Sequence, residues 1–350
     1  MSVQDAKIIT RNPIFNPAGN DDASDRTIIK GNTTGLFNLN VVKYPWAKSL
    51  YQVMVGNFWL PEKVSGLKDD ARDFSTLSKD EQTAYKGILS FLIFLDSIQT
   101  VNLPNFSNYI TSPDVNLLLS IQAFQEGIHS QSYATILESV VSSEERNEIY
   151  YFWRTNPVLL ERNTYIGQIY QDFIDTPNDQ TFFRGLVANF LLEGLYFYNG
   201  FAFFDTLVDH MKMPATGRMI AYIRRDELTH VALFSNIIRE IKREFSDIYD
   251  ESLILEMTRT AVEQEVIWSK HILGNKIMGI NGEMTEQYTK WLANQRLSML
   301  WVSPAYPEAI SNPYKHLDRL QDPNADKWNF FETTVINYAQ SSSMKGSWDF

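Results

Sequence analysis

The sequence predicts an all-α protein, and two observations carry this prediction. Long segments repeat apolar residues at the spacing of an α-helix, whereas the strict alternation typical of strands is scarce throughout. The motif Glu-x-x-His occurs twice inside such segments, as Glu126 with His129 and as Glu227 with His230, in a chain with only five histidines. Residues three apart lie on one face of an α-helix, so each motif presents a carboxylate beside an imidazole.

The ends of the expected helices follow from capping and turn residues. Ser78 and Glu81 have the spacing of a capping box, and Thr176 before Pro177 resembles a cap followed by proline in the first turn. The first three expected helices run from near Trp46 to Pro61, from the capping box past Asp96 to Pro104, and from near Pro113 to Val141. A second capping box follows at Ser142 and Glu145. Further helices are expected from Thr176 through Glu193 to about His210, from Pro214 to Glu244, and over about 249–275 and 284–299.

These segments form one predicted domain between two irregular ends. Residues 1–42 have Asn-Pro and Gly-Asn turn chemistry and no sustained period, so we expect an irregular arm there. We assign the helical domain to residues 43–322 and a flexible tail to residues 323–350, which ends in aromatic residues.

Composition excludes several classes of function. The formal net charge of −11 argues against binding to nucleic acid or to an anionic membrane surface. The strongest apolar run, 88–95, is too short to span a bilayer, and no secretory signal is visible, so we expect a cytoplasmic protein. The chain has no cysteine, so any metal site must use oxygen and nitrogen ligands, which suit iron or manganese.

Two further acids stand in strongly apolar surroundings. Asp96 follows a nearly continuous apolar run, and Glu193 lies inside another. Acids are rarely buried unless they are paired or bind a metal, although either one alone could tip out to solvent or pair with an arginine. With the two Glu-x-x-His motifs they supply the ligand set of a dinuclear carboxylate site in a ferritin-like bundle. The six expected ligands are Asp96, Glu126, His129, Glu193, Glu227 and His230.

Ferritins, hydroxylases, desaturases and radical generators share such sites, so the neighbouring residues must distinguish among them. Here the chain resembles the small subunit (β, or R2) of class I ribonucleotide reductase, from about Asn57 to the C-terminus. The resemblance rests on the segments Asp96-Ser97-Ile98-Gln99, Glu126-x-x-His129-x-x-x-Tyr133, Glu193-Gly194-x-x-Phe197-x-x-x-Phe201 and Arg225-Asp226-Glu227-x-x-His230.

The resemblance implies that Tyr133 carries a stable tyrosyl radical, formed by two iron or manganese ions. Phe197, Phe201 and Ile223 would line an apolar pocket that protects this radical from water and reductants. Taken singly, each of these residues could equally be an ordinary core residue.

The resemblance also implies a route for long-range radical transfer. Trp59, in Asn57-Phe58-Trp59-Leu60-Pro61-Glu62, would be linked through Asp226 to the ligand His129. In the tail, Glu332 and Tyr338 match the family's residues for transfer to the large subunit, on which the aromatic C-terminal end would dock. Taken alone, Trp59 could be a buried anchor and the tail a plain solvated end.

The expected function is therefore that of the β subunit of ribonucleoside-diphosphate reductase, a homodimer that is active only with its large subunit. The sequence leaves open whether the metal is iron or manganese, and a manganese form would need a flavodoxin-like activating partner. Two alternatives are an R2-like dinuclear oxygenase acting on a small molecule, and metal storage of the ferritin type.

Overall fold

The computed structural model describes residues 13–320 of the chain, and within this range helices account for the regular structure, with Ile277 and Ile280 forming only an isolated bridge. The α-helices are α1 (Pro45–Gly56), α2 (Leu67–Thr76), α3 (Lys79–Tyr109), α4 (Pro113–Val140), α5 (Ser143–Thr155), α6 (Pro157–Asp175), α7 (Asp179–Leu191), α8 (Tyr198–Asp209), α9 (Pro214–Glu244), α10 (Glu251–Ile272) and α11 (Gly282–Met299). Shorter helical segments are η1 (Pro61–Lys63), η2 (Leu192–Tyr196) and η3 (Lys315–Leu320).

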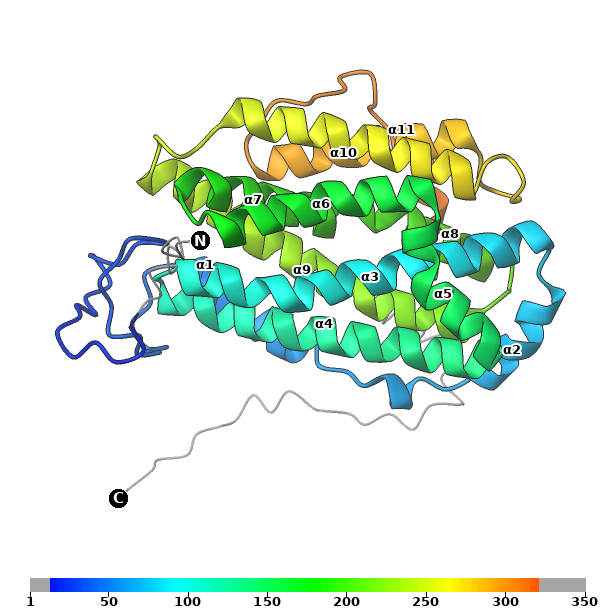
Figure 1. The fold of residues 1–350 in the computed structure, drawn as a ribbon, viewed down its shortest axis with the longest axis horizontal. Coiled ribbons are helices and arrows are strands. Elements are labelled where there is room, and N and C mark those ends of the chain that lie inside the picture. Colours follow the sequence, from blue (N-terminus) through cyan, green and yellow to red (C-terminus); the bar gives the residue numbers. More distant parts are fainter. Residues whose placement is uncertain (1–12, 321–350) are drawn as a thin grey trace, which may run out of the picture.

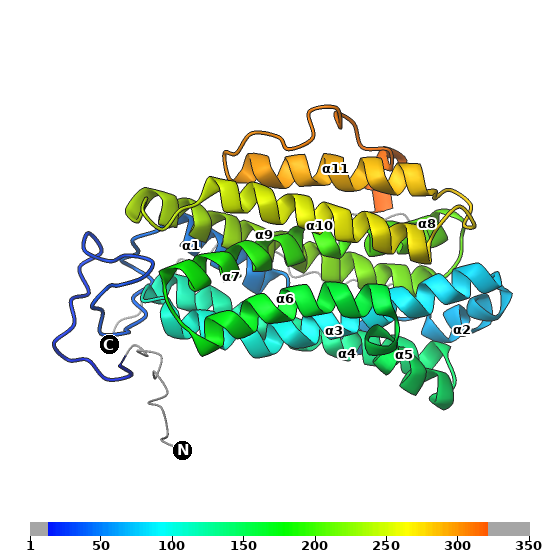
Figure 2. The same ribbon diagram turned by 45° about the horizontal axis from the view of Figure 1, so that its top comes forward.

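The long helices run side by side in a bundle (Figure 1). Helices α3 and α4 pack against each other on one side, and α10 pairs with α11 on the opposite side, as both views show (Figure 2). Helix α9 lies between these layers and contacts α4, α7 and α8. Helix α3 is long and apolar enough to cross a membrane, but 67% of its most apolar window is buried inside the bundle, as in the core helix of a globular protein.

Several predicted helix ends are confirmed. The capping boxes of Ser78 with Glu81 and of Ser142 with Glu145 both form, and they start α3 and α5. Helix α9 has the predicted bounds, with proline at its start and Lys242 in its last turn.

Three predicted boundaries are wrong. Helix α1 ends at Gly56 and does not reach Pro61, because the residue before a proline favours extended backbone and Leu60 is extended. Pro104 lies inside α3, which continues to Tyr109, because Leu103 and Phe106 on either side of it are buried in the core. That burial outweighs the backbone hydrogen bond that proline removes. Thr176 ends α6, and the cap of α7 is Asn178, whose side chain accepts hydrogen bonds from the next turn. Helices α2 and α6 were not predicted.

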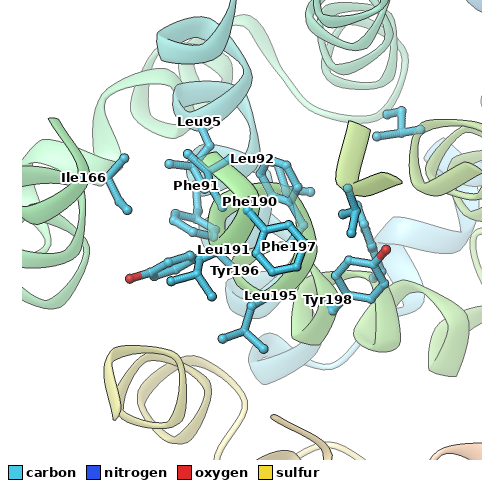
Figure 3. Close-up of a cluster of buried hydrophobic side chains, with 14 of the residues drawn as sticks. Phe91, Leu92, Leu95, Ile166, Phe190, Leu191, Leu195, Tyr196, Phe197 and Tyr198 are labelled. Atoms are coloured by element: carbon cyan, nitrogen blue, oxygen red, sulfur yellow. The ribbon is translucent and has the colours of Figure 1, made fainter. Parts of the chain in front are cut away.

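The segment expected to be one helix around Glu193 is three elements. Helix α7 passes into the π-helical turn η2 and then into α8, and Glu193 lies inside η2. The spacing of four residues from Glu193 to Phe197 therefore does not follow α-helical geometry. A cluster of apolar side chains from α3, α6 and this segment surrounds the π-turn (Figure 3).

A buried ion pair between Arg162 and Glu265 joins α6 to α10 next to the π-turn. Arg162 donates to Glu265 at 2.5 Å, and its guanidinium lies 3.9 Å from the centre of the Phe91 ring. Glu265 also accepts a hydrogen bond from Asn199 of α8, at 3.1 Å. Both members of the ion pair are almost wholly inaccessible to solvent, so each depends on the other for compensation of its charge.

The substitution Arg162→Met should lower the free energy of unfolding by about 3–5 kcal/mol, because it leaves the Glu265 carboxylate buried without a cation. Adding Glu265→Gln should recover much of this loss, since the carboxamide can still accept the bond from Asn199. Denaturant unfolding of the metal-free proteins measures both effects. The control is Lys270→Met, which breaks the exposed pair with Glu286 and should cost less than about 1 kcal/mol. If Arg162→Met and Lys270→Met lowered the free energy of unfolding equally, the buried ion pair would contribute no more to stability than the exposed pair.

Candidate metal centre

Four neighbouring elements bring the six predicted ligands together in the interior of the bundle. Asp96 comes from α3, Glu126 and His129 from α4, Glu193 from η2, and Glu227 and His230 from α9; none has measurable solvent exposure. Their ligand atoms form two groups, each within 4.8 Å: Asp96, Glu126, His129 and Glu227 in the first, and Glu126, Glu193, Glu227 and His230 in the second.

Two carboxylates, Glu126 and Glu227, belong to both groups. This sharing is the arrangement expected of two adjacent metal positions with bridging carboxylates. The Nδ1 atom of His129 lies 3.1 Å from Glu227 Oε1 and 3.3 Å from Glu126 Oε2, while His230 Nδ1 lies 3.3 Å from Glu126 Oε1.

The donor atoms fit a pair of metal ions. Buried polar atoms normally have hydrogen-bond partners, and leaving them without one is costly. Six atoms of the predicted ligands have none, and they belong to five residues: Asp96 Oδ1 and Oδ2, Glu126 Oε2, His129 Nδ1, Glu193 Oε2 and Glu227 Oε1. Oxygen and imidazole nitrogen donors without thiolates suit iron or manganese.

Burial in the metal-free cluster favours the protonated forms of two of its carboxyl groups. Burial, together with the charge of Glu126, raises the pKa of Asp96 well above its ordinary value, and burial with the charges of Glu193 and Glu126 does the same for Glu227. Burial opposes protonation of His129, but the adjacent carboxylates of Asp226, Glu126 and Glu227 outweigh it and raise its pKa well above the usual value. Protons thus supply part of the positive charge that four buried carboxylates require.

Asp226 forms hydrogen bonds with the predicted ligand His129 and with Trp59. Its Oδ2 atom accepts a hydrogen bond from Trp59 Nε1 at 2.8 Å and lies 3.3 Å from His129 Nε2. This contact leaves Nδ1 of His129 facing the cluster. Trp59 is half-buried and stacks on Tyr222, with the ring centres 5.0 Å apart.

Tyr133 is buried one helical turn beyond His129, and its hydroxyl has no hydrogen-bond partner. Burial raises its pKa well above the ordinary value, and the charges of Asp96 and Glu227 add to the effect. Phe197, Phe201 and Ile223 are also buried, and the first two rings pack with their centres 5.9 Å apart. Glu332, Tyr338 and the aromatic C-terminal end lie outside the described residues.

The sequence predictions missed a set of buried amides around the cluster. Gln99 and Gln122 both bond to Glu193, and Gln125 Oε1 lies 3.0 Å from Nε2 of His230. An amide one helical turn from Asp96, from Glu126 and from Glu193 was the signal that could have indicated them.

The chain is similar to known proteins over most of its length. The family model for "Ribonucleotide reductase, small chain" matches residues 36–313. A ribonucleoside-diphosphate reductase subunit beta from Treponema pallidum is 41% identical over 98% of this chain and 99% of its own length. This chain belongs to the ribonucleotide reductase small-chain family.

Solved structures of the small-chain family have the same fold. The R2 subunit from Clostridium botulinum is 44% identical, with a TM-score of 0.86 over 89% of this chain and 98% of its own. A structure described as a class I ribonucleotide reductase from Bacillus halodurans is 37% identical, with a TM-score of 0.82 over 87% and 97% of the two chains. The resemblance inferred from the sequence motifs and the predicted ferritin-like fold are therefore confirmed.

Metal binding to this small chain should release protons and should tighten as pH rises. Asp96 and Glu227 have raised pKa values, so they hold protons at pH values where ordinary carboxyls are ionised, and a metal ion must displace them. Titration with Mn(II) in weakly buffered solution, followed by pH, should show net release, and the affinity should fall as pH is lowered. Binding without proton release, and with an affinity independent of pH, would contradict this account of the cluster.

Proposed function

We propose that this chain is the small (β) subunit of a class I ribonucleoside-diphosphate reductase, which forms and stores a radical on Tyr133 and passes it to a large subunit for the reduction of ribonucleotides. The observation that supports the proposal most directly is the pair of buried ligand groups together with a buried tyrosine, Tyr133, on the helix that carries Glu126 and His129, in a chain of this family. Membership of the family implies a large-subunit partner and a homodimer. We also assign the chain to the cytoplasm.

The six ligands would hold two ions of iron or manganese, with Glu126 and Glu227 shared between them. When bound, such ions supply a one-electron oxidant. If the metal is manganese, activation would also need a flavodoxin-like partner, as the family resemblance implies. The buried position of the ligands keeps water and reductants away from the oxidised site.

Tyr133 is suited to store the oxidising equivalent. Its raised pKa keeps the phenol neutral, so loss of its electron must be accompanied by loss of the hydroxyl proton. Asp96, whose charge raises the pKa of this hydroxyl, would accept that proton. The side chains of Phe197, Phe201 and Ile223 would form the apolar surroundings in which the radical is stable.

Trp59 and Asp226 would serve as the first part of a reversible transfer route. Oδ2 of Asp226 accepts hydrogen bonds from Nε1 of Trp59 and Nε2 of His129, and these bonds would form a continuous path from the half-buried indole to the metal site. Tyr338 and Glu332 in the tail would continue the route to the large subunit. The chain has no cysteine, so thiols that reduce the ribose must belong to that partner.

The substitution Tyr133→Phe should abolish the stable radical without preventing metal binding. Aerobic loading of the wild-type protein with Fe(II), or Mn(II) loading with a reduced flavodoxin and oxygen, should give an organic radical signal in the electron paramagnetic resonance spectrum. The phenylalanine variant should bind the same amount of metal and show no such signal. The control is Tyr85→Phe, which removes a buried hydroxyl bonded to Thr216, and the radical should persist in that variant. A radical in the Tyr133→Phe protein would place it on another residue.

Deletion of residues 330–350 should leave radical formation intact but abolish ribonucleotide reduction with the large subunit. The tail would supply both the docking segment and Tyr338, whereas the metal ligands lie in the described helices. Radical content and product formation are measured on the same preparations. Full reductase activity in the deletion protein would refute the role of the tail, and oxygen-dependent turnover of a small molecule would instead indicate the oxygenase alternative.

A further inference from the structure

Buried amide side chains stand one helical turn from three of the carboxylate ligands. Gln99 follows Asp96 by three residues on α3, Gln122 precedes Glu126 by four on α4, and Asn189 precedes Glu193 by four at the end of α7. All three amides have no solvent exposure. Burying an amide is unfavourable unless it forms hydrogen bonds, so the partners of these groups matter.

Two of these amides donate to the same oxygen of one ligand. Nε2 of Gln99 and Nε2 of Gln122 both donate to Oε1 of Glu193, the second at 2.8 Å. The other oxygen of Glu193, Oε2, has no hydrogen-bond partner and lies 3.8 Å from Nδ1 of His230. The two donors therefore orient the Glu193 carboxylate. Its Oε1 atom is bonded to the amides, and its Oε2 atom is on the side of His230.

A second set of contacts fixes the orientation of the Gln99 amide. Its Oε1 atom accepts a hydrogen bond from the hydroxyl of Tyr170 at 2.8 Å, and its Nε2 atom also donates to Oδ1 of Asn189 at 2.6 Å. Rotating the amide by 180° would place its oxygen against the Glu193 carboxylate and lose these bonds. Gln122 is held in turn by donation at 3.2 Å to Oε1 of Glu126, the oxygen of this shared ligand that lies 3.3 Å from His230 Nδ1 in the second group.

These contacts distinguish the two ligand groups. Glu193 belongs only to the second group, with His230, and Asp96 belongs only to the first. Both oxygens of Asp96 are without hydrogen-bond partners, whereas Glu193 has two amide donors on one oxygen. The carboxylate specific to the second group is thus held in place, and the one specific to the first is not.

We propose that Gln99 and Gln122 are positioning residues that hold Glu193 by Oε1, so that it binds metal through Oε2, and that they set the affinity of the second metal position alone. Tyr170 and Asn189 support this arrangement by orienting Gln99. The inference rests on the proposed dinuclear site and adds a difference between its two positions. Hydrogen-bonding partners of metal ligands typically contribute tenfold to a hundredfold to metal affinity.

The test is Mn(II) binding to the full-length chain and to its Gln99→Met and Gln122→Met variants. Methionine has a similar length but no amide, so it preserves packing and removes the donor. The wild-type chain should bind two ions. Each variant should bind one ion with nearly wild-type affinity and the other about tenfold to a hundredfold more weakly. At a metal concentration that fills both positions of the wild type, the variants should show the resonance spectrum of an isolated Mn(II) ion instead of a coupled pair.

A matched control lies on the same helix. Asn102 is a buried amide one turn beyond Gln99 and bonds to none of the six ligands, so Asn102→Leu should leave both affinities unchanged. Thermal unfolding of the metal-free proteins reports whether each variant is folded. If a methionine variant does not fold, Tyr170→Phe tests the same arrangement, and the second ion should bind about threefold to tenfold more weakly.

The outcomes separate this inference from the proposed function. Unchanged affinities, or an equal loss at both positions, would overturn the role of Gln99 and Gln122 while leaving the dinuclear site in place. A wild-type chain that binds fewer than two ions would refute the dinuclear site itself, and the inference with it.

Discussion

The mutual repulsion of four carboxylates in the core is the constraint on which the rest of this structure depends. Asp96, Glu126, Glu193 and Glu227 come from four different elements, and burial removes the water that would otherwise screen them. Long helices with extensive apolar contacts keep the four elements together despite this repulsion. Protons and metal ions are alternative sources of the positive charge that the cluster needs.

The side chains around the cluster make its two ends chemically different. The imidazole of His129 is backed by the Asp226 carboxylate, whereas His230 is backed by the neutral amide of Gln125. The first end therefore leads through a charged hydrogen bond to Trp59 and the edge of the bundle. The second end is surrounded by amides that hold its ligands in place. A site with similar ligands at both ends thus has one end hydrogen-bonded to the proposed transfer route and the other end hydrogen-bonded to buried amides.

Much of the fold and of the site could be predicted from the sequence because the relevant rules are local. Capping boxes, prolines at helix starts, Glu-x-x-His spacing and acids inside apolar runs each act over one or two helical turns, and they located α3, α5, α9 and the six predicted ligands that the structure brings together. What failed depended on packing between elements. Pro104 is tolerated because of core contacts across the bundle, and the partners of Gln99 come from α6, α7 and η2. No short-range pattern specifies such contacts.

The π-turn at Glu193 gives the segment from α7 to α8 two helical phases. A π-turn accommodates one more residue than an α-helical turn, so the residues after it are rotated by about 100° relative to an uninterrupted α-helix. Residues of α7 such as Phe183 and residues of α8 such as Phe203 can then both face the interior, although no single helical wheel would place them on a common face. Residues 185–199 are buried without interruption, so the segment is enclosed by the core on every side, and this is why it is apolar on every side when it is drawn as one helix. The turn that carries Glu193, a predicted metal ligand, therefore lies where no face of the chain reaches solvent.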